Sequence, residues 1–398
     1  MSMCEHHYRI AIISEGHSES TLPLVNALLN KGCEVDYYVI ARSSYVSVDA
    51  APICLSSIRL GVNLIDNEQL GALNDYFSAD KVRVLVVRLA RPYLSVPVVR
   101  AALKFVNFFI VKYFGVYLNK QKYDLVNIST RYNTSDVEYL ASIVKPKMVF
   151  SLHEVCNHLY PNYDTPTSLL KQIKRNKLDI VLHSQKSYDD ILKYNLFDKE
   201  NLHIVHFGKF ETYSLFRPAP IKELPNKYIL FFGVINEYKG IEIMYDLIRA
   251  YPEDYKDVKI VIAGKGYVPI IDKMKEDSHF ILINRYIPNE ELAYLFERSS
   301  FVICPYKSIS QSGIPQTAFV FNKPILSSNI ESFKEIIHAP SFGLYVETTN
   351  LEEWNKCVQM LWRTNEVESM SRNLEQFETV LPSFSWNNIA DMYLEFVK

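Results

Sequence analysis

Residues 301–327 read FVICPYKSISQSGIPQTAFVFNKPILS, and this stretch decides the fold of the second half of the chain. An apolar strand at 301–304 runs into a polar loop and then a helix, for which Ser312 is the predicted N-cap and Pro315 fits the first turn. A second apolar strand follows at 325–327. The unbonded amide groups at the start of such a helix favour an anion such as phosphate in the loop. An ordinary turn between strand and helix is the alternative.

The remainder of the second half repeats this alternation of strands and helices with short connections. Strands are expected at 228–234, 258–263, 280–283, 301–304 and 325–327, with another from residue 344. Alternation of this kind predicts a doubly wound parallel sheet, which binds ligands at the carboxyl ends of its strands. The first half opens with a similar strand–helix–strand unit over 8–40, although its loop lacks the G-x-G-x-x-G pattern of a dinucleotide site. We therefore expect an α/β protein with two Rossmann-like domains.

A proline-rich stretch at 217–225 has the composition of a linker. It divides the chain into a predicted first domain at 1–215 and a second at 216–383. The last residues, 384–398, form an amphipathic helix that we expect to pack back toward the first domain.

The overall composition is that of a globular protein. The chain has 398 residues, is 48% hydrophobic and carries a net charge of −2, which argues against a nucleic-acid partner. Its six cysteines are scattered without C-x-x-C spacing, so neither zinc nor a disulfide framework is expected. No apolar run reaches about 18 residues without a charge, and the N-terminus lacks a signal-peptide pattern. These features predict a cytoplasmic protein without a transmembrane helix, placed at the inner face of the membrane if its basic stretch binds lipid.

The basic stretch at 81–122 contains nine Lys and Arg residues and no Asp or Glu. Apolar and aromatic residues separate the charges, most densely at 101–114. A helix of this kind can bind an anionic membrane surface as a peripheral contact. It can equally be a long core helix with one solvated basic edge, and the sequence leaves both interpretations open.

Two further junctions in the second half have the residues of a phosphate site. Residues 231–240 read FFGVINEYKG, so that Gly233 ends a strand and Lys239 begins the next helix. A helix start disfavours a cation unless an anion lies nearby, and lysine is suited to phosphate. The next strand ends in Gly264, within a second glycine-rich loop. Taken singly, each feature is also compatible with a surface lysine or a tight turn.

In this order the motifs resemble those of retaining glycosyltransferases of the GT-B fold, in the large family 4 that includes sucrose and polysaccharide-building enzymes. Residues 233–240 resemble the family's Gly-Arg-x(4)-Lys-Gly motif, and 262–266 resemble its second glycine motif. Residues 325–330 and 342–346 resemble two later motifs, Val-Val-Ala-Thr-Asp-Val and Asn-Gly-Leu-Leu-Val. The resemblance implies a GT-B architecture, in which two Rossmann-like domains face each other across a cleft.

The first half resembles the family more loosely. Residues 151–158, SLHEVCNH, are similar to a His-Asp-x(3)-His stretch, and weaker similarities occur at 181–187 and 206–208. The resemblance implies that His153 contacts the transferred sugar or the acceptor and that the acceptor side includes Gly16, His17 and Glu154. A structural role is the alternative for each histidine.

The implied activity is transfer of a sugar from a nucleotide-sugar donor to a carbohydrate or lipid-linked oligosaccharide, in surface polysaccharide synthesis. Retention of configuration follows from the resemblance alone, and neither a metal nor a cofactor is expected. His153 and Lys239 are the predicted catalytic residues. The predicted donor site consists of Gly233, Asn236, Lys239, Gly264, Tyr286, Ile287, Gln311, Ser312, Gly313 and Thr317.

The chain also departs from the family pattern. Val234 occupies the position of the motif arginine. The family's Glu-x(7)-Glu pair is absent, with its first member falling on residue 309 or 310 and its second on 317 or 318. These losses keep two alternatives open: a catalytically impaired binding partner with the same fold, and another enzyme on the fold, such as a nucleotide-sugar epimerase or a phosphorylase.

Overall fold

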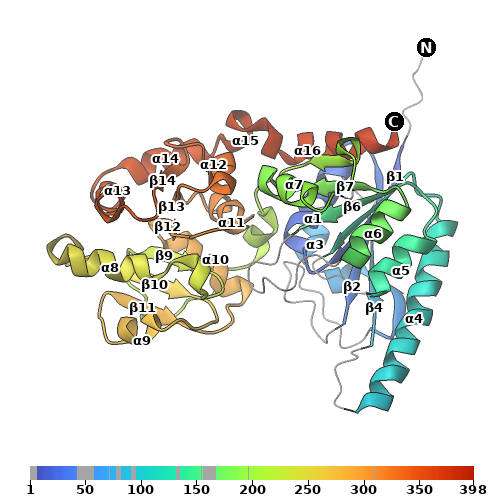
Figure 1. Ribbon diagram of the computed structural model, residues 1–398, viewed down its shortest axis with the longest axis horizontal. Coiled ribbons are helices and arrows are strands. Elements are labelled where there is room, and N and C mark those ends of the chain that lie inside the picture. The colour runs from blue at the N-terminus through green and yellow to red at the C-terminus, as the bar shows by residue number, and fades with distance from the viewer. Residues whose placement is uncertain are drawn as a thin grey trace. The chain divides into compact units, whose positions relative to one another are not determined.

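The computed structural model describes residues 7–42, 58–70, 72–77, 82–90, 96–130, 135–153, 155, 167–195, 197–309 and 311–398. The chain divides into two compact units (Figure 1). Unit 1 comprises Met1–Gly208 together with Ser383–Lys398, and unit 2 comprises Lys209–Pro382. The sequence-based division placed the corresponding boundaries after residues 215 and 383.

Unit 1 is built on one sheet with the strand order β3-β4-β2-β1-β5-β6-β7-β8. The strands are β1 (Arg9–Glu15), β2 (Glu34–Ala41), β3 (Gly61–Leu64), β4 (Val82–Arg88), β5 (Leu125–Thr130), β6 (Met148–Leu152), β7 (Asp179–Leu182) and β8 (Leu202–Ile204). Every neighbouring pair is parallel except β3 and β4, which are antiparallel. From β1 the chain builds outward in one direction and returns beside β1 as β5. The carboxyl ends of β1 and β5 are thus a topological switch point, where doubly wound sheets bind ligands.

Helices cover this sheet and bury its apolar residues. They are α1 (Ser18–Asn30), α2 (Asn67–Leu70), α3 (Ala72–Tyr76), α4 (Pro97–Lys120), α5 (Ser135–Ile143), α6 (Thr167–Arg175), α7 (Gln185–Leu192) and α16 (Trp386–Leu394). The last of these comes from the chain's end and packs on α1. The Lys31 ammonium contacts the Asp391 carboxylate at 2.7 Å, and the Tyr393 hydroxyl lies 2.8 Å from Ser151 Oγ.

Helix α4 has two unlike parts. Its second part carries Asn107, Val111, Phe114 and Leu118, which are buried against the unit 1 sheet. The Asn107 carboxamide accepts a hydrogen bond from the Ala90 amide at 2.7 Å and donates one to the Ala90 carbonyl at 3.0 Å. The first part, residues 97–106, contains no buried residue and extends past the strands (Figure 1).

Within the described residues, α4 alone is long and apolar enough to cross a membrane by length and composition. This qualifies the expectation that no segment could do so, which rested on charge-free runs. Core packing of the second part of α4 makes it a helix of the folded unit. Residues 81 and 91–95 of the basic stretch lie outside the described residues.

Unit 2 has the predicted doubly wound sheet, with all strands parallel in the order β11-β10-β9-β12-β13-β14. Its strands are β9 (Ile229–Phe232), β10 (Ile260–Ala263), β11 (Phe280–Ile283), β12 (Phe301–Cys304), β13 (Ile325–Ser328) and β14 (Gly343–Val346). Its helices are α8 (Glu242–Ala250), α9 (Ile270–Lys275), α10 (Asn289–Arg298), α11 (Ile314–Val320), α12 (Glu331–Ile337), α13 (Leu351–Arg363), α14 (Glu366–Leu374) and α15 (Phe377–Val380). The switch point of this sheet lies between β9 and β12.

Candidate active site

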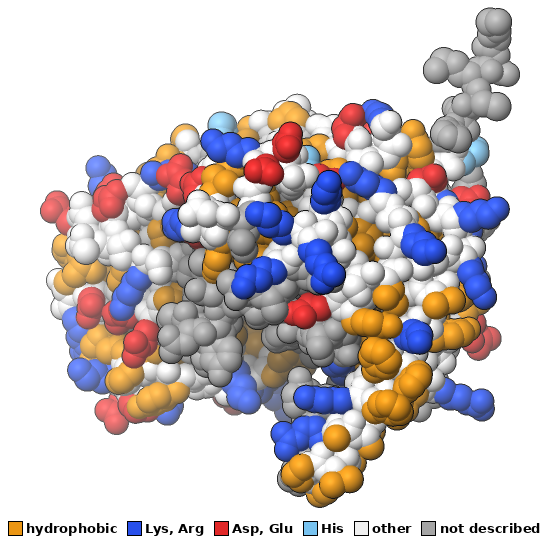
Figure 2. Space-filling model, turned by 45° about the vertical axis from the view of Figure 1, so that its right-hand side comes forward, with side chains coloured by type: hydrophobic (Ala, Val, Ile, Leu, Met, Phe, Trp, Pro, Cys, Tyr) orange, Lys and Arg blue, Asp and Glu red, His pale blue; other side chains and the backbone are white. Residues whose placement is uncertain are grey.

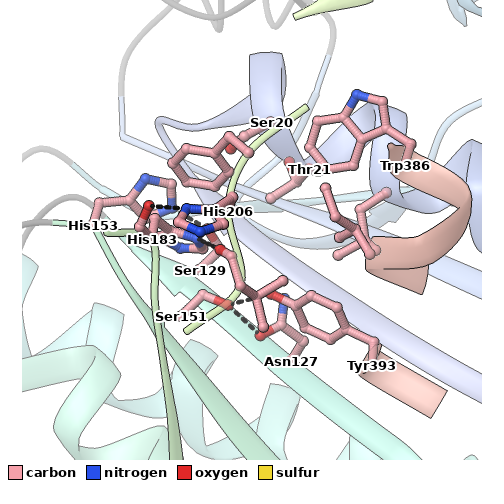
Figure 3. Close-up of a pocket in the computed structure, with 14 residues that line it drawn as sticks. Ser20, Thr21, Asn127, Ser129, Ser151, His153, His183, His206, Trp386 and Tyr393 are labelled. Atoms are coloured by element: carbon pink, nitrogen blue, oxygen red, sulfur yellow. Dashed lines mark hydrogen bonds between the residues drawn. The ribbon is translucent and has the colours of Figure 1, made fainter. Parts of the chain in front are cut away.

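The first candidate group lies at the carboxyl ends of β5, β6 and β7 in unit 1 (Figure 3). His153 follows β6, is 7% exposed, and its Nε2 lies 2.7 Å from Ser129 Oγ at the end of β5. His17 stacks on His153 with ring centroids 3.4 Å apart. The structure therefore brings together the two histidines that the sequence analysis had placed on the acceptor side. Gly16, with a φ of 85°, makes the turn that leads from β1 to His17.

The sequence analysis gave His183 no role, although it belongs to the same group. His183 Nδ1 donates a hydrogen bond to the Val205 carbonyl at 2.7 Å, and its ring stacks on Phe207 at 3.7 Å. Burial lowers the pKa of His183 to about 3, so this imidazole is neutral. The motif at 181–187 was the only sequence signal for it.

A small cavity lies beside these rings. Its volume of about 10 Å³ has room for roughly one water molecule and not for a sugar. Two atoms that border it, Asn127 Nδ2 and His183 Nε2, are buried without a hydrogen-bond partner among the described residues. The polar residues around this cavity hold the histidine rings in place, but the cavity is too small to be a substrate pocket. Glu154, the remaining predicted acceptor-side residue, lies outside the described residues.

The second candidate group surrounds Lys239 at the switch point of unit 2. Lys239 ends a 3-10 turn, Glu237–Lys239, in the connection after β9, and α8 begins only at Glu242. Its side chain is 6% exposed, and the ammonium lies over the Tyr306 ring, 4.9 Å from the centroid. Tyr306 follows β12, so this contact joins the two connections that diverge from the switch point.

No carboxylate or other hydrogen-bond acceptor contacts the Lys239 ammonium within the part of the chain that the structure describes. Instead, the ammonium lies over the aromatic rings of Tyr306 and Phe231. The nearby Cys304 is no counter-ion, because burial raises the pKa of its thiol to about 12. Burial lowers the pKa of Lys239 to about 8. A buried cation without a partner is costly, and an anionic ligand would offset that cost.

Glycines at the ends of β9 and β10 let the backbone approach this lysine. A Cβ on Gly233, whose φ is 116°, would lie 2.7 Å from Lys239 Nζ. A Cβ on Gly264, whose φ is 148°, would lie 1.9 Å from the Gly233 carbonyl oxygen. The two glycines are therefore required by close contacts between neighbouring connections, and their predicted place in the donor site stays a prediction.

The loop before α11 differs in detail from the prediction. The helix begins at Ile314 and its N-cap is Gly313, so the assignment of Ser312 as the cap was wrong. Ser312, one residue before this N-cap, accepts a hydrogen bond at Oγ from the Ile314 amide at 3.3 Å. Thr317 is buried and donates its hydroxyl proton to the Gly313 carbonyl at 2.9 Å. Gln311 precedes them as a partly exposed residue.

The other predicted donor residues lie around the same sheet edge. Asn236 is the N-cap of the Lys239 turn and accepts the Lys239 amide proton at its carbonyl, at 3.1 Å. Tyr286 is 52% exposed after β11, whereas Ile287 is buried. The Tyr286 carbonyl accepts a hydrogen bond from Arg285 Nη1 at 3.1 Å, so this backbone group is already engaged.

Sequence reasoning missed two residues that fix the site. Tyr306 is fully buried under the Lys239 ammonium, and burial raises the pKa of its phenol, so it offers a neutral ring and no charge. Asn284 joins the loops after β10 and β11, donating to the Gly266 carbonyl at 2.8 Å and accepting the Gly266 amide at 3.1 Å. The only sequence signal for Tyr306 and Asn284 is that each lies shortly after an apolar strand.

Part of the chain is similar to known proteins. Residues 226–364 match the family model described as "Glycosyl transferases group 1". The matched residues lie within unit 2. A GDP-mannose:glycolipid 4-beta-D-mannosyltransferase of Xanthomonas campestris pv. campestris is 28% identical over 114 residues, which are 27% of this chain and 32% of that protein.

Both units of the chain are similar to solved structures. A sucrose-phosphate synthase from Thermosynechococcus elongatus has a TM-score of 0.64 at 16% identity, over 98% of each chain. Anabaena HepE, solved in complex with UDP and glucose, has a TM-score of 0.60 at 15% identity, over 98% of this chain and 99% of that one. These likenesses confirm the predicted GT-B fold. By sequence, the chain spans about a third of the length of the curated relatives it matches.

The structure shows the surroundings of most residues that depart from the group 1 motifs. Val234, at the position of the motif arginine, is 48% exposed and supplies no charge beside Lys239. At the positions of the glutamate pair stand Ile309 and the buried Thr317, or residues 310 and 318 in the other alignment. Residue 310 lies outside the described residues. Lys239 is therefore the one cation, among the residues described in this loop cluster, that is both buried and unpaired.

Proposed function

We propose that the protein is a glycosyltransferase that moves a sugar from a nucleotide-sugar donor to a carbohydrate or lipid-linked acceptor. The observation that carries the proposal is the buried, unpaired ammonium of Lys239 at the switch point of unit 2. A nucleotide diphosphate supplies the anion that this cation lacks. The family match over residues 226–364 supports the same assignment.

The proposed chemistry is electrostatic. When the bond between sugar and diphosphate breaks, negative charge grows on the leaving diphosphate, and a fixed cation in a water-poor site stabilises it. Lys239 fills this role, with the ammonium already positioned over Tyr306. Gly233 and Gly264 leave space for the donor to approach the backbone. Because a lysine neutralises the charge, we propose that turnover needs no metal ion.

The acceptor side is proposed to involve His153. The Ser129 hydroxyl fixes its Nε2 at 2.7 Å, and the His17 ring covers one face of the imidazole. Substitutions of His153 and Ser129 distinguish a substrate contact of His153 from a structural role. His153→Gln should lower turnover without lowering the melting temperature if the ring contacts a substrate. A large loss of melting temperature, shared by Ser129→Ala, would instead indicate a structural histidine.

The pathway and stereochemistry are further parts of the proposal. We place the reaction in surface polysaccharide synthesis at the inner face of a membrane, with retention of anomeric configuration. The name of the Xanthomonas relative specifies a glycolipid acceptor and a β linkage for that protein. NMR of the product made here, giving the anomeric coupling of the new linkage, tests the stereochemistry directly.

Calorimetric titration with UDP-, GDP- and ADP-linked sugars tests the proposed function. One donor class should bind, and Lys239→Ala should weaken that binding at least tenfold. Lys273→Ala is a matched control, because Lys273 is an exposed lysine on α9 of the same unit. If no donor binds, or if Lys239→Ala binds as wild type does, the assignment fails.

A non-catalytic binding partner is the second candidate, favoured by the missing motif arginine and glutamate pair. It differs from the first in its products. A transferase releases free nucleotide diphosphate in the presence of an acceptor, whereas a binding partner binds the donor and releases none. Chromatography of the nucleotide products after prolonged incubation separates the two.

A further inference from the structure

Helix α4 carries a second apolar stripe that the fold of unit 1 does not use. Residues 107, 111, 114 and 118 face the core, with the spacing of one helix face. Residues 98, 102, 105, 109 and 116 recur with the same helical period and are exposed. In this second set Val98 is 78% exposed, Phe105 65% and Phe109 50%. The helix is thus apolar on two sides, which a solvated core helix is not expected to be.

The aromatic rings of this stripe contact one another rather than the core. The Phe105 and Phe109 rings lie edge to face with centroids 4.7 Å apart. Tyr113, one turn further on, is 62% exposed. Figure 2 shows apolar side chains gathered along the projecting helix, with basic side chains beside them. Contiguous exposed apolar surface of this kind marks an interaction site.

The charges on the helix indicate which partner fits. Arg100, Lys104 and Lys112 are exposed and form no ion pair within the described part of the chain. No carboxylate occurs anywhere in the sequence from 81 to 122. Two copies of such a helix would repel each other, whereas an anionic surface is complementary to it. Phenylalanine and tyrosine flanked by Lys and Arg are typical of helices at the headgroup region of a bilayer.

The helix length excludes a spanning arrangement in this fold. Residues 97–106, which precede the first core residue, measure about 15 Å, roughly half the thickness of the hydrocarbon layer. Asn107, bonded to Ala90, keeps the rest of α4 on the sheet.

We infer that the exposed face of α4 is a monotopic membrane anchor, which lies in the interface of an anionic phospholipid bilayer. Its apolar stripe enters the acyl boundary, and Arg100, Lys104 and Lys112 contact lipid phosphates. This inference does not depend on the proposed sugar transfer, because vesicle binding is measured without donor.

Co-sedimentation of the full chain with lipid vesicles tests the anchor. Vesicles of phosphatidylcholine containing about 30% phosphatidylglycerol should bind the protein, and vesicles of pure phosphatidylcholine should bind it about tenfold less. Phe105→Ser/Phe109→Ser and Arg100→Glu/Lys104→Glu should each reduce binding about tenfold or more. Leu64→Ser, at an apolar residue 66% exposed on β3, and Lys174→Glu, on α6, are matched controls that should bind as wild type.

Other results would overturn the inference. They include equal binding to both vesicle types and wild-type binding by the two α4 variants. A third is the absence of vesicle binding together with a wild-type dimer, seen in sedimentation velocity, that the Phe105→Ser/Phe109→Ser variant does not form. That result would assign the exposed face of α4 to a contact with a second copy of the chain. The substituted residues are exposed, and circular dichroism of each variant verifies that the fold is intact.

Discussion

The switch points of the two sheets have opposite electrostatics. In unit 1, the connections after β1, β6 and β7 meet in stacked histidine rings beside the end of β5, with hydrogen-bond partners at Ser129 and Val205. In unit 2, the connections after β9 and β12 meet at a lysine ammonium that has no acceptor among the residues that the structure describes. These stacked rings, of which His183 is neutral, are compatible with a purely structural role. An unpaired buried cation destabilises the fold, and the proposed binding of an anion would offset that cost.

Lys239→Met is the substitution with the largest expected effect on the difference between the two switch points. Removing the cation should lower turnover by about 10²–10³-fold, because one electrostatic stabiliser of the leaving group is lost. The same variant should raise the free energy of unfolding at pH 7 by up to about 3 kcal/mol, because folding lowers the pKa of Lys239 from 10.5 to about 8.

The sign of that stability change is specific. Below pH 8 Lys239 is charged in both states, and water solvates that charge better in the unfolded chain. The Lys239→Met substitution therefore gives its full increase in unfolding free energy there. Between pH 8 and 10.5 the unfolded lysine keeps its proton while the folded one loses it, and the gain disappears. Chemical denaturation at pH 7 and pH 10 measures both values; a less stable Lys239→Met at pH 7 would contradict the account.

Gly264→Ala tests the close contact beside the lysine. A Cβ there would lie 1.9 Å from the Gly233 carbonyl oxygen, at a φ of 148°. We expect a loss of about 3 kcal/mol or more in unfolding free energy. Gly61→Ala is the matched control, because Gly61 also has a positive φ, 112°, but nothing lies within 4 Å of its Cβ position. Similar losses in the two variants would mean that backbone conformation, and not the contact, decides the effect.

His183→Asn tests the neutral side of the comparison. Asparagine can keep the hydrogen bond to the Val205 carbonyl while removing the titrating ring. The pKa of His183 falls from 6.5 to about 3 on folding, so the unfolded chain gains a proton first as pH falls below 6.5. Wild type should therefore lose about 2 kcal/mol more than the variant between pH 7 and pH 5. Parallel pH profiles of the two proteins would show that His183 is not buried as a neutral ring.

The smallest expected effect is the pH dependence of donor binding. Lys239 must be protonated to hold a diphosphate, and its pKa in the free protein is about 8. A bound anion raises that pKa, so affinity should be level below pH 8 and fall by up to about tenfold per pH unit above it. Calorimetry from pH 7 to 9 measures this, with Lys239→Met expected to show no such slope in its residual binding. A slope shared by both proteins would place the titrating group elsewhere.

Local pattern was sufficient for much of this molecule. Strands ending in Gly233 and Gly264, and a lysine shortly after the first of them, could be read directly because each lies within one strand–loop–helix unit. The helix start was less predictable: both Ser312 and Gly313 can precede a first turn, and the bond from the Ile314 amide to Ser312 depends on how the loop after β12 is held. Tyr306 carried no local signal for its contact with Lys239, since some 67 residues separate them.

By itself, the sequence determined the alternation of strands and helices and the parallel sheets, and it predicted the residues of a phosphate site, because hydrophobic period and turn chemistry act over a few residues. It also supplied the basic, aromatic composition of residues 81–122 but left the environment of that helix open. Only the tertiary structure decided that Lys239 is buried without a counter-ion among the described residues and that one face of α4 is exposed. Both depend on which distant segments the sheet order brings together, and burial is a property of that packing.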